Sequence, residues 1–224
     1  FRAPALEELY NSGPHFGNQT YEIGNQDLKR ERSDGVDIAL RYQRSWINSE
    51  LNFFYYDIDN FVFLAPTKKL RDGLVEAAYK QGDSRFLGSE VSLNLRLHDY
   101  IWLNLGLDLV DSNLRPTGGP LPRIPPLRGS VGLDWRYKNM SVRPELIMRD
   151  SRKDIFSTET PTAGHSIFNL KAAYTIPQQH FAHHLSINFF NIGNRLYRNH
   201  LSFIKDLAPE IGRGIRFSYA VKYF

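Results

Sequence analysis

Two neighbouring stretches decide the fold predicted for this chain: VSLNLRLH (91–98) and IWLNLGLDL (101–109). Apolar and polar residues alternate in both, so the apolar side chains of an extended strand fall on one face and the polar ones on the other. Only Asp99 and Tyr100 separate the two stretches, which predicts a tight hairpin. The same alternation recurs at 36–42, 131–137, 168–174 and 185–189.

The connections between these strands alternate between short and long. Tight turns are expected near 45–48, 98–100 and 138–140. Long connections rich in Pro, Gly and charge are expected at 65–73, 112–126, 150–165 and 194–212. With 74–97 as one long strand, kinked near Gly82 or Gly88, the pattern predicts about nine antiparallel strands, with short turns at one end and long loops at the other.

The composition excludes several classes of protein. The chain has 224 residues and no cysteine, so it has no disulfide framework, thiolate metal site or thiol nucleophile. Its formal net charge of +4 is spread with mixed signs, too evenly for a nucleic-acid-binding surface. No run of about 18 apolar residues is present, so no transmembrane helix is expected. The mean hydropathy of −0.42 favours a soluble protein, but 13% of the residues are aromatic.

Two all-β architectures fit the alternation: a soluble sandwich, and a membrane barrel whose apolar face contacts lipid. Several of the expected strands run 12 residues or more, whereas strands in globular proteins average about 5–6. Aromatic residues lie near the strand ends, as in the girdles of membrane barrels: Trp46, Tyr100, Trp102, Trp135, Tyr137 and Tyr223. We therefore favour the barrel. The residues expected to face lipid are Leu93, Leu95, Leu103, Leu105, Leu107, Val131 and Leu133, and those expected to face inward are Asn94, Arg96, Asp108 and Asp134.

A series of short motifs points to one family. FRAPALEELY (1–10) is followed by an N-x-x-L-x-x-E-x-S pattern at Asn25, Leu28, Glu31 and Ser33. Then come FFYYDIDNFV (53–62), FLGSEVSLNLRL (86–97) with Gly88 and Glu90, and a closing segment, NIGNRLYRNHLSFI (191–204), that leads to Gly212, Arg213 and a terminal aromatic. In this order the motifs resemble the TonB-dependent outer-membrane receptors of Gram-negative bacteria.

The resemblance implies an all-β fold, an antiparallel transmembrane β-barrel located in the cell outer membrane of a Gram-negative bacterium. Residues 1–224 would be the carboxyl-terminal portion of the barrel domain, about nine strands of a barrel of about 22 strands. A plug domain and the earlier strands are expected to precede Phe1. Phe224 falls one step out of phase with Tyr223, so either Tyr223 supplies the lipid-facing terminal aromatic or a bulge shifts the register.

The function implied by the resemblance is that of a receptor and active transporter for a scarce nutrient. The substrate would be an iron-siderophore, haem, cobalamin or a metal ion such as zinc, and the TonB system would energise uptake. The implied partners are outer-membrane lipid, the protein's own plug domain, the TonB system through the amino-terminal region, and a metal or metal chelate. No enzymatic activity, cofactor or nucleic-acid partner is expected. The alternatives are a soluble all-β binding module, distinguished by independence from detergent, and a passive porin, distinguished by the absence of a plug.

No set of residues in the sequence indicates catalysis. The seven histidines are scattered, and nothing fixes a Ser/His/Asp geometry. HFAHH (180–184) falls on the short-turn side, where a solvated turn is a better interpretation than a metal cluster.

Residues of the long loops are the candidates for substrate binding, and the loops expected to meet the ligand are 2–32, 112–125, 150–165 and 194–212. Imidazole nitrogens ligate metals, guanidinium groups bind anionic chelates in bidentate fashion, and an aromatic ring can stack on a chelate. The candidates are His15, His165, Arg195, Tyr197, Arg198 and His200. The alternative is that they are ordinary loop residues. HLSFIKDLAPEIGRG (200–214) faintly resembles the last loop of zinc-uptake members of the family.

Charged residues on the polar sides of the strands are the candidates for contact with the plug. These are Asp37, Arg41, Glu90, Arg96, Asp108, Asp134 and Arg136, with Lys171 of the same kind. The alternative is a hydrated network of lumen charges without a specific partner.

Overall fold

The computed structural model describes residues 1–115 and 117–224, so Pro116, in the loop expected at 112–125, lies outside the described residues. The elements are α1 (Leu6–Tyr10), β1 (Ser12–His15), β2 (Thr20–Ile23), β3 (Arg32–Arg44), β4 (Ile47–Arg71), β5 (Leu74–His98), β6 (Ile101–Leu114), β7 (Arg128–Tyr137), β8 (Met140–Arg149), β9 (His165–Pro177), β10 (Phe181–Phe190) and β11 (Gly214–Tyr223). In this part of the chain, no helix is long and apolar enough to cross a membrane.

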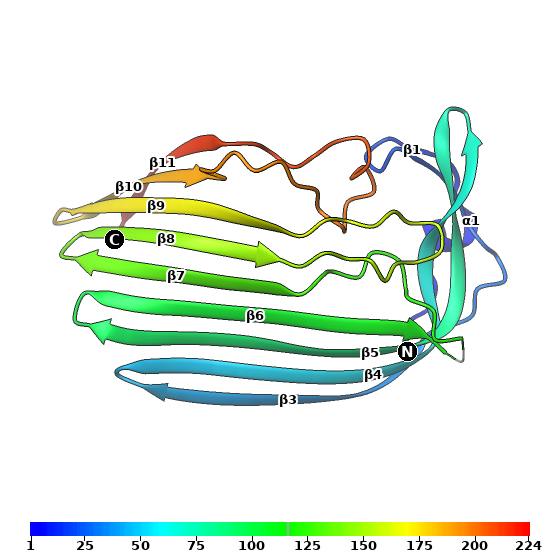
Figure 1. Cartoon of the computed structure of the whole chain (residues 1–224), viewed down its shortest axis with the longest axis horizontal. Helices are drawn as coiled ribbons and strands as arrows, with labels where there is room; N and C mark the ends of the chain where they lie inside the picture. Colours follow the sequence, from blue (N-terminus) through cyan, green and yellow to red (C-terminus); the bar gives the residue numbers. More distant parts are fainter. Residues whose placement is uncertain (116) are drawn as a thin grey trace.

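Strands β3 to β11 form one antiparallel sheet in which each strand pairs with the next along the chain (Figure 1). These nine strands confirm the predicted number and order. Within the described residues β3 and β11 pair with no further strand on their outer edges, so the sheet is open.

Strands β1 and β2 were not predicted, and they correct the expectation of antiparallel pairing throughout. β2 pairs in parallel with β5, with Thr20 opposite Val75 and Ile23 opposite Ala78. The pairing of β6 with β5 stops at Ser84, so the backbone groups of β5 beyond that point need another partner on this edge. β2 supplies these hydrogen bonds.

The tight turns agree with the prediction at three places. β3 and β4 are joined through 45–46, β5 and β6 through 99–100, and β7 and β8 through 138–139. Figure 1 shows these turns, together with the connection from β9 to β10, at one end of the sheet and the long connections at the other. We call these the turn end and the loop end.

The segment 65–73 is not the long loop that its Pro, Gly and charged residues predicted. β4 continues to Arg71 and β5 begins at Leu74, so a two-residue turn at Asp72–Gly73 closes a long hairpin. One tight turn therefore lies at the loop end, contrary to the prediction. A register shift between Ile58 and Phe61 lies opposite Asp83, so the irregularity expected near Gly82 falls on β4, and β5 is one strand as predicted.

The two faces of the sheet are segregated as the alternation predicted. One row of directly paired residues crosses five strands with only apolar side chains: Leu93, Leu105, Val131, Leu146 and Phe168. The adjacent row consists of Asn94, Asn104, Gly132, Glu145 and Asn169. We call these the apolar face and the polar face.

Aromatic rings gather at the turn end of the apolar face. The ring centroids of Tyr100 and Tyr137 are 5.4 Å apart, and those of Phe181 and Tyr223 are 5.2 Å apart. Trp102 is an exception, because it pairs with Asp134 and so shares the polar face. β11 pairs with β10 without a register shift, so Tyr223, and not Phe224, is the terminal aromatic of the apolar face.

Candidate functional site

The buried apolar residues of the chain lie mainly at the loop end. They include Tyr21, Leu28, Val62, Leu64, Ala65, Ala77, Leu121, Ile124 and Ile167. They come from β2, the far part of the β4–β5 hairpin and the loops around them, so these segments pack on one another as a folded unit. The loop end is therefore a built structure able to hold side chains in fixed positions.

The first two sequence motifs form one part of this unit. Arg2 of the FRAP stretch donates two hydrogen bonds to Glu31, from Nε to Oε2 at 2.6 Å and from Nη2 to Oε1 at 2.8 Å. The Val62 backbone N–H donates to the same carboxylate at 2.6 Å. Burial alone would raise the pKa of Glu31, but the hydrogen bonds from Arg2 and Val62 lower it overall. The motifs thus attach the start of the chain to β4.

A cleft of about 650 Å³ opens within this unit. Phe61, Phe63 and Phe86 line one part of it, and the centroids of Phe61 and Phe86 are 5.1 Å apart in an edge-to-face arrangement. Glu7, Glu8 and His15 line another part. We call this space the loop-end cleft.

Arg123 and Phe203 bring two of the predicted loops together at this cleft. The Arg123 guanidinium carbon lies 3.5 Å from the centroid of the Phe203 ring, a close cation–π contact. Burial lowers the pKa of Arg123, but an arginine stays charged under such conditions. Among the ion pairs of the described residues, none joins this guanidinium to a carboxylate. The cleft therefore contains a half-buried cation held on an aromatic ring.

Glu22, which sequence analysis missed, is the buried carboxylate of the cleft. Its side chain accepts hydrogen bonds from Asn11 and Asn18 at 3.1 Å each, from Thr20 at 3.2 Å and from the Tyr79 hydroxyl at 3.4 Å. Four donors from three segments hold the charge in place. No local sequence signal identifies Glu22, because its partners depend on how β1, β2 and β5 assemble.

The candidate histidines are not brought together. His15 lines the loop-end cleft, where its Nδ1 accepts a hydrogen bond from the Asn18 backbone N–H at 3.2 Å. In the described part of the chain, no group of three or more His, Cys, Asp or Glu residues is arranged to hold a metal ion.

His200 joins two loops from inside. Its Nδ1 lies 2.9 Å from the Thr162 hydroxyl and 3.3 Å from the Lys205 ammonium, and the side chain is only 3% exposed. Thr160 donates to Asp206 at 2.8 Å, which fixes the same two loops a second time. Burial and the neighbouring Lys205 lower the pKa of His200 to about 4. The ring is therefore neutral, and its Nδ1 is engaged by Thr162 and Lys205.

The remaining candidates are His165, Tyr197, Arg195 and Arg198. The ring centroid of His165 is 4.6 Å from that of Tyr197, and both His165 ring nitrogens are buried without a hydrogen-bond partner in the described structure. Arg198 donates to the backbone carbonyl of Lys205. The Arg195 backbone N–H donates to the Asn191 side chain at 2.8 Å. A substrate-binding role for these residues stays a prediction.

The plug-contact candidates lie on or beside the polar face, and most are already paired. Asp37 accepts from Tyr56 at 2.6 Å, and Arg41 contacts Glu50 at 2.8 Å. Arg96 contacts Asp99 at 3.1 Å in the adjacent turn. Asp108 contacts Arg128, and Asp134 contacts Arg136, both at 2.5 Å. Glu90 lines a polar-face cavity of about 510 Å³ with Arg149 and, from the last loop, Asn199 and Leu201. That loop therefore reaches over the polar face.

Comparison with known proteins identifies the family to which this architecture belongs. The family model described as "TonB dependent receptor-like, beta-barrel" matches residues 1–194. A solved copper transporter, OprC, is 19% identical with a TM-score of 0.82, over 99% of this chain and 35% of that one. The siderophore receptor PirA from Pseudomonas aeruginosa is 17% identical with a TM-score of 0.64, over 100% of this chain and 38% of that one. The FrpB iron transporter from Neisseria meningitidis is 15% identical with a TM-score of 0.65, over 93% and 34%.

These structures share the fold, and the chain spans about a third of the length of each. The family consists of transporters and receptors of the Gram-negative outer membrane, where the apolar face of a barrel contacts lipid and the polar face lines the lumen. This chain belongs to the TonB-dependent receptor β-barrel family.

Proposed function

We propose that residues 1–224 form the carboxyl-terminal part of the barrel of an outer-membrane receptor that takes up a metal chelate. The observation that carries this proposal is the loop-end cleft, which combines an aromatic wall with a half-buried arginine on the side where the long loops meet. Ligand sites are typically concave and largely apolar, with a few placed polar groups.

The chemistry of the cleft favours a chelate with planar or aromatic groups and anionic donor atoms. Phe61, Phe63 and Phe86 offer ring faces and edges for stacking. Arg123, already on Phe203, offers N–H donors to an anionic oxygen. The names of similar structures include siderophore receptors, iron transporters and a copper transporter, all of which handle metals. A bare metal ion such as zinc is the second candidate, because one similar structure is named a copper transporter. It has less support than a chelate, since the described residues include no group of three or more His, Cys, Asp or Glu arranged to hold a metal.

Transport through such a barrel requires a gate and a source of energy. We propose that a plug domain encoded before Phe1 supplies the gate and that the TonB system moves it. A passive porin, the alternative, would admit the same solute without energy.

The test uses the full-length receptor in the outer membrane of cells depleted of iron. The probe is a radiolabelled ferric catecholate, with radiolabelled Zn²⁺ as the second arm and a protonophore added to half of the samples. We expect saturable ferric catecholate uptake that the protonophore abolishes. Uptake that the protonophore leaves unchanged would indicate a porin, and saturable uptake of Zn²⁺ alone would favour the second candidate.

Two variants test the position of the site. Phe203→Ala removes the ring beneath Arg123 and should weaken ferric catecholate binding about 3- to 10-fold, as expected from the loss of one stacking contact. Leu207→Ala is the matched control, because Leu207 lies on the same loop, is 73% exposed and is not among the residues lining the cleft. Equal affinities for the two variants, in barrels that assemble normally, would overturn the assignment of the cleft.

A further inference from the structure

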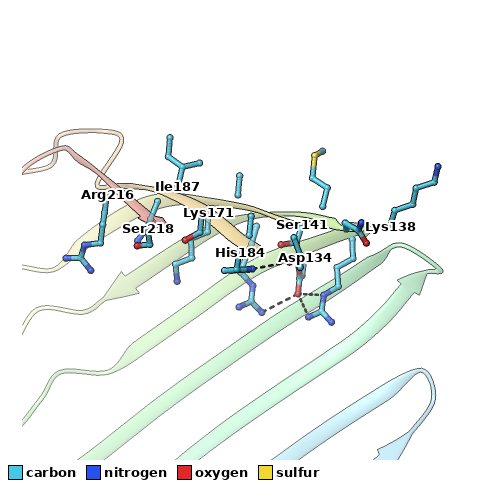
Figure 2. Close-up of a pocket in the computed structure, with 17 residues that line it drawn as sticks. Asp134, Lys138, Ser141, Lys171, His184, Ile187, Arg216 and Ser218 are labelled. Atoms are coloured by element: carbon cyan, nitrogen blue, oxygen red, sulfur yellow. Dashed lines mark hydrogen bonds and ion pairs between the residues drawn. The ribbon is translucent and has the colours of Figure 1, made fainter. Parts of the chain in front are cut away.

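Four residues form a straight row across strands β8 to β11 on the polar face. Arg143 pairs directly with Lys171, Lys171 with Asn188, and Asn188 with Arg216. Figure 2 shows Lys171 and Arg216 on the same side of the sheet as Asp134, whereas Ile187 points to the other side. We call these four residues the cationic row.

The row is poorly balanced by carboxylates. Arg143 lies 3.7 Å from Asp134, whose main partner is Arg136 at 2.5 Å. Lys171 lies 3.8 Å from Glu145. In the part of the chain that the structure describes, Arg216 forms no ion pair. The row thus carries three positive charges with only shared or distant compensation.

Like charges also pair directly elsewhere in this sheet, at Asp34–Asp57, Glu90–Asp108 and Arg128–Arg149, but each of those pairs has a member in an ion pair of 3.5 Å or shorter. On β3 and β4, Arg41 pairs directly with Glu50, so opposite charges face each other. Arg143 and Lys171 are like charges in the same kind of direct pairing, which is destabilising in an isolated sheet. If only water contacted this part of the polar face, the repulsion between the two cations would not be offset. A bound anionic surface would offset it.

The surroundings of the row contain further groups for hydrogen bonding. The row lines a cleft of about 690 Å³, together with Arg136 and the hydroxyl groups of Ser186 and Ser218. Asn188 Oδ1 is buried and accepts no hydrogen bond in the described structure. The row therefore lacks a compensating anion.

The dimensions favour a polypeptide over a small anion. Arg143 and Arg216 lie three inter-strand spacings apart, which corresponds to roughly 14 Å. A small tricarboxylate cannot reach both ends. An extended segment advances about 3.3 Å per residue, so acidic side chains at alternate positions would span the row with about five residues.

We propose that the cationic row is a docking surface for an acidic segment of the plug domain, held against β8–β11 inside the barrel. This inference rests on the proposed function, because it takes the lumen to be filled by a plug. It adds the sign of the charge and the strands on which the contact is made.

Photo-crosslinking in the full-length receptor identifies the occupant. A benzophenone amino acid is placed at Ser218, which lines the cleft on the polar face, or at its neighbour Phe217 on the apolar face as the matched control. We expect Ser218, but not Phe217, to crosslink to a segment outside residues 1–224 with at least two Asp or Glu in five residues. Crosslinks to neutral or basic segments only, or no crosslink at all, would overturn the proposal.

A charge variant provides a second, independent measurement. Arg143→Gln, Lys171→Gln and Arg216→Gln together should lower the urea concentration at which the plug becomes sensitive to protease and should remove the salt dependence of that midpoint. The mobility of the unheated barrel on gels should be unchanged, which controls for folding. A midpoint and salt dependence equal to those of the wild type would contradict the proposal. Ferric catecholate uptake by the wild-type receptor is scored separately, so a failure of the proposed function is distinguishable from a failure of this inference.

Discussion

His200 shows how one side chain connects two loops. Its ring is buried between Thr162 and Lys205, and burial lowers its pKa to about 4, against about 6.5 for an unperturbed histidine. The unfolded loop would therefore bind a proton between these two pH values when the folded loop does not. Linkage then predicts that the attachment of the loop is fully stable above about pH 6.5 and weakens as the pH falls toward 4.

Hydrogen exchange of the backbone amides in 191–213, measured from pH 7.5 to 4.5 and corrected for intrinsic rates, tests this prediction. Protection should decrease below about pH 6.5. In His200→Gln, whose side chain at 200 cannot titrate, protection should depend less steeply on pH, although it should be lower than in the wild type at pH 7.5. The same pH dependence in both proteins would exclude His200 as the group responsible.

Gly88 supports an aromatic ring on the polar face. A Cβ at this position would lie 2.2 Å from Phe54 Cζ, so even alanine cannot fit without moving the ring. We expect Gly88→Ala to destabilise the barrel by about 1–3 kcal/mol, the usual cost of overpacking. Adding Phe54→Leu should recover part of the loss.

Urea unfolding of the full-length receptor in lipid vesicles measures both effects. Gly129→Ala is the control, because its Cβ would meet Met148 Cε at 3.7 Å, an ordinary contact. If Gly88→Ala were no more destabilising than Gly129→Ala, the packing of Phe54 on Gly88 would not be a constraint.

At the scale of the strand, the alternation on β5 places neighbouring residues on opposite faces of the sheet. Leu93 lies on the apolar face and Ser92 on the polar face, one residue apart. Near the middle of a bilayer, Leu93→Arg should lower the free energy of unfolding by about 2–4 kcal/mol, and Ser92→Arg by much less. Equal losses for both variants, measured in the same vesicles, would argue against a lipid-facing apolar surface.

The elements also show which features a sequence can reveal. The alternation of apolar and polar residues predicted the nine strands of the main sheet and their faces. This works because successive residues of each strand face lipid and lumen in turn, so the signal lies within the strand itself. The alternation missed β1 and β2, since their pairing depends on an edge of β5 that is free only where β6 ends. It also gave 65–73 as a loop, because Pro66 and Gly73 are turn residues in most contexts, whereas here the hairpin tolerates them at a register shift and a tip.

The candidate site shows the same difference between features set by local sequence and features set by contacts between distant segments. Arg123 and Phe203 lie in two of the loops expected to meet the ligand, 112–125 and 194–212, but only the folded loops place one on the other. Glu22 gave no signal at all, because its four donors come from separate segments. The histidines have the chemistry of metal ligands, but the fold places them apart: His15 lines the loop-end cleft, His200 contacts Thr162, and His165 packs on Tyr197. Side-chain chemistry can be read from a sequence, but proximity between loops cannot.

At the scale of the whole molecule, the open sheet determines how residues 1–224 should behave alone. β3 and β11 present edges that pair with no other described strand, and a bilayer does not tolerate unpaired backbone groups. We expect the isolated polypeptide to form aggregates or strand-exchanged oligomers in detergent and the full-length receptor to be monodisperse. Light scattering coupled to size-exclusion chromatography would show this. A monodisperse, protease-resistant monomer of residues 1–224 would contradict the expectation.

The position of the buried apolar cluster at the loop end has a consequence for how the protein could diversify. The wall depends on hydrocarbon to cover its apolar face, whereas Leu64, Ala77 and Leu121 are covered by their own neighbours. Substitutions in the loop-end unit, the ligand site proposed above, should therefore leave insertion of the barrel undisturbed. The loop-end unit of one receptor could then be joined to the barrel strands of a related receptor to change the ligand that is bound. The junctions would lie where β4 and β5 extend beyond the main sheet.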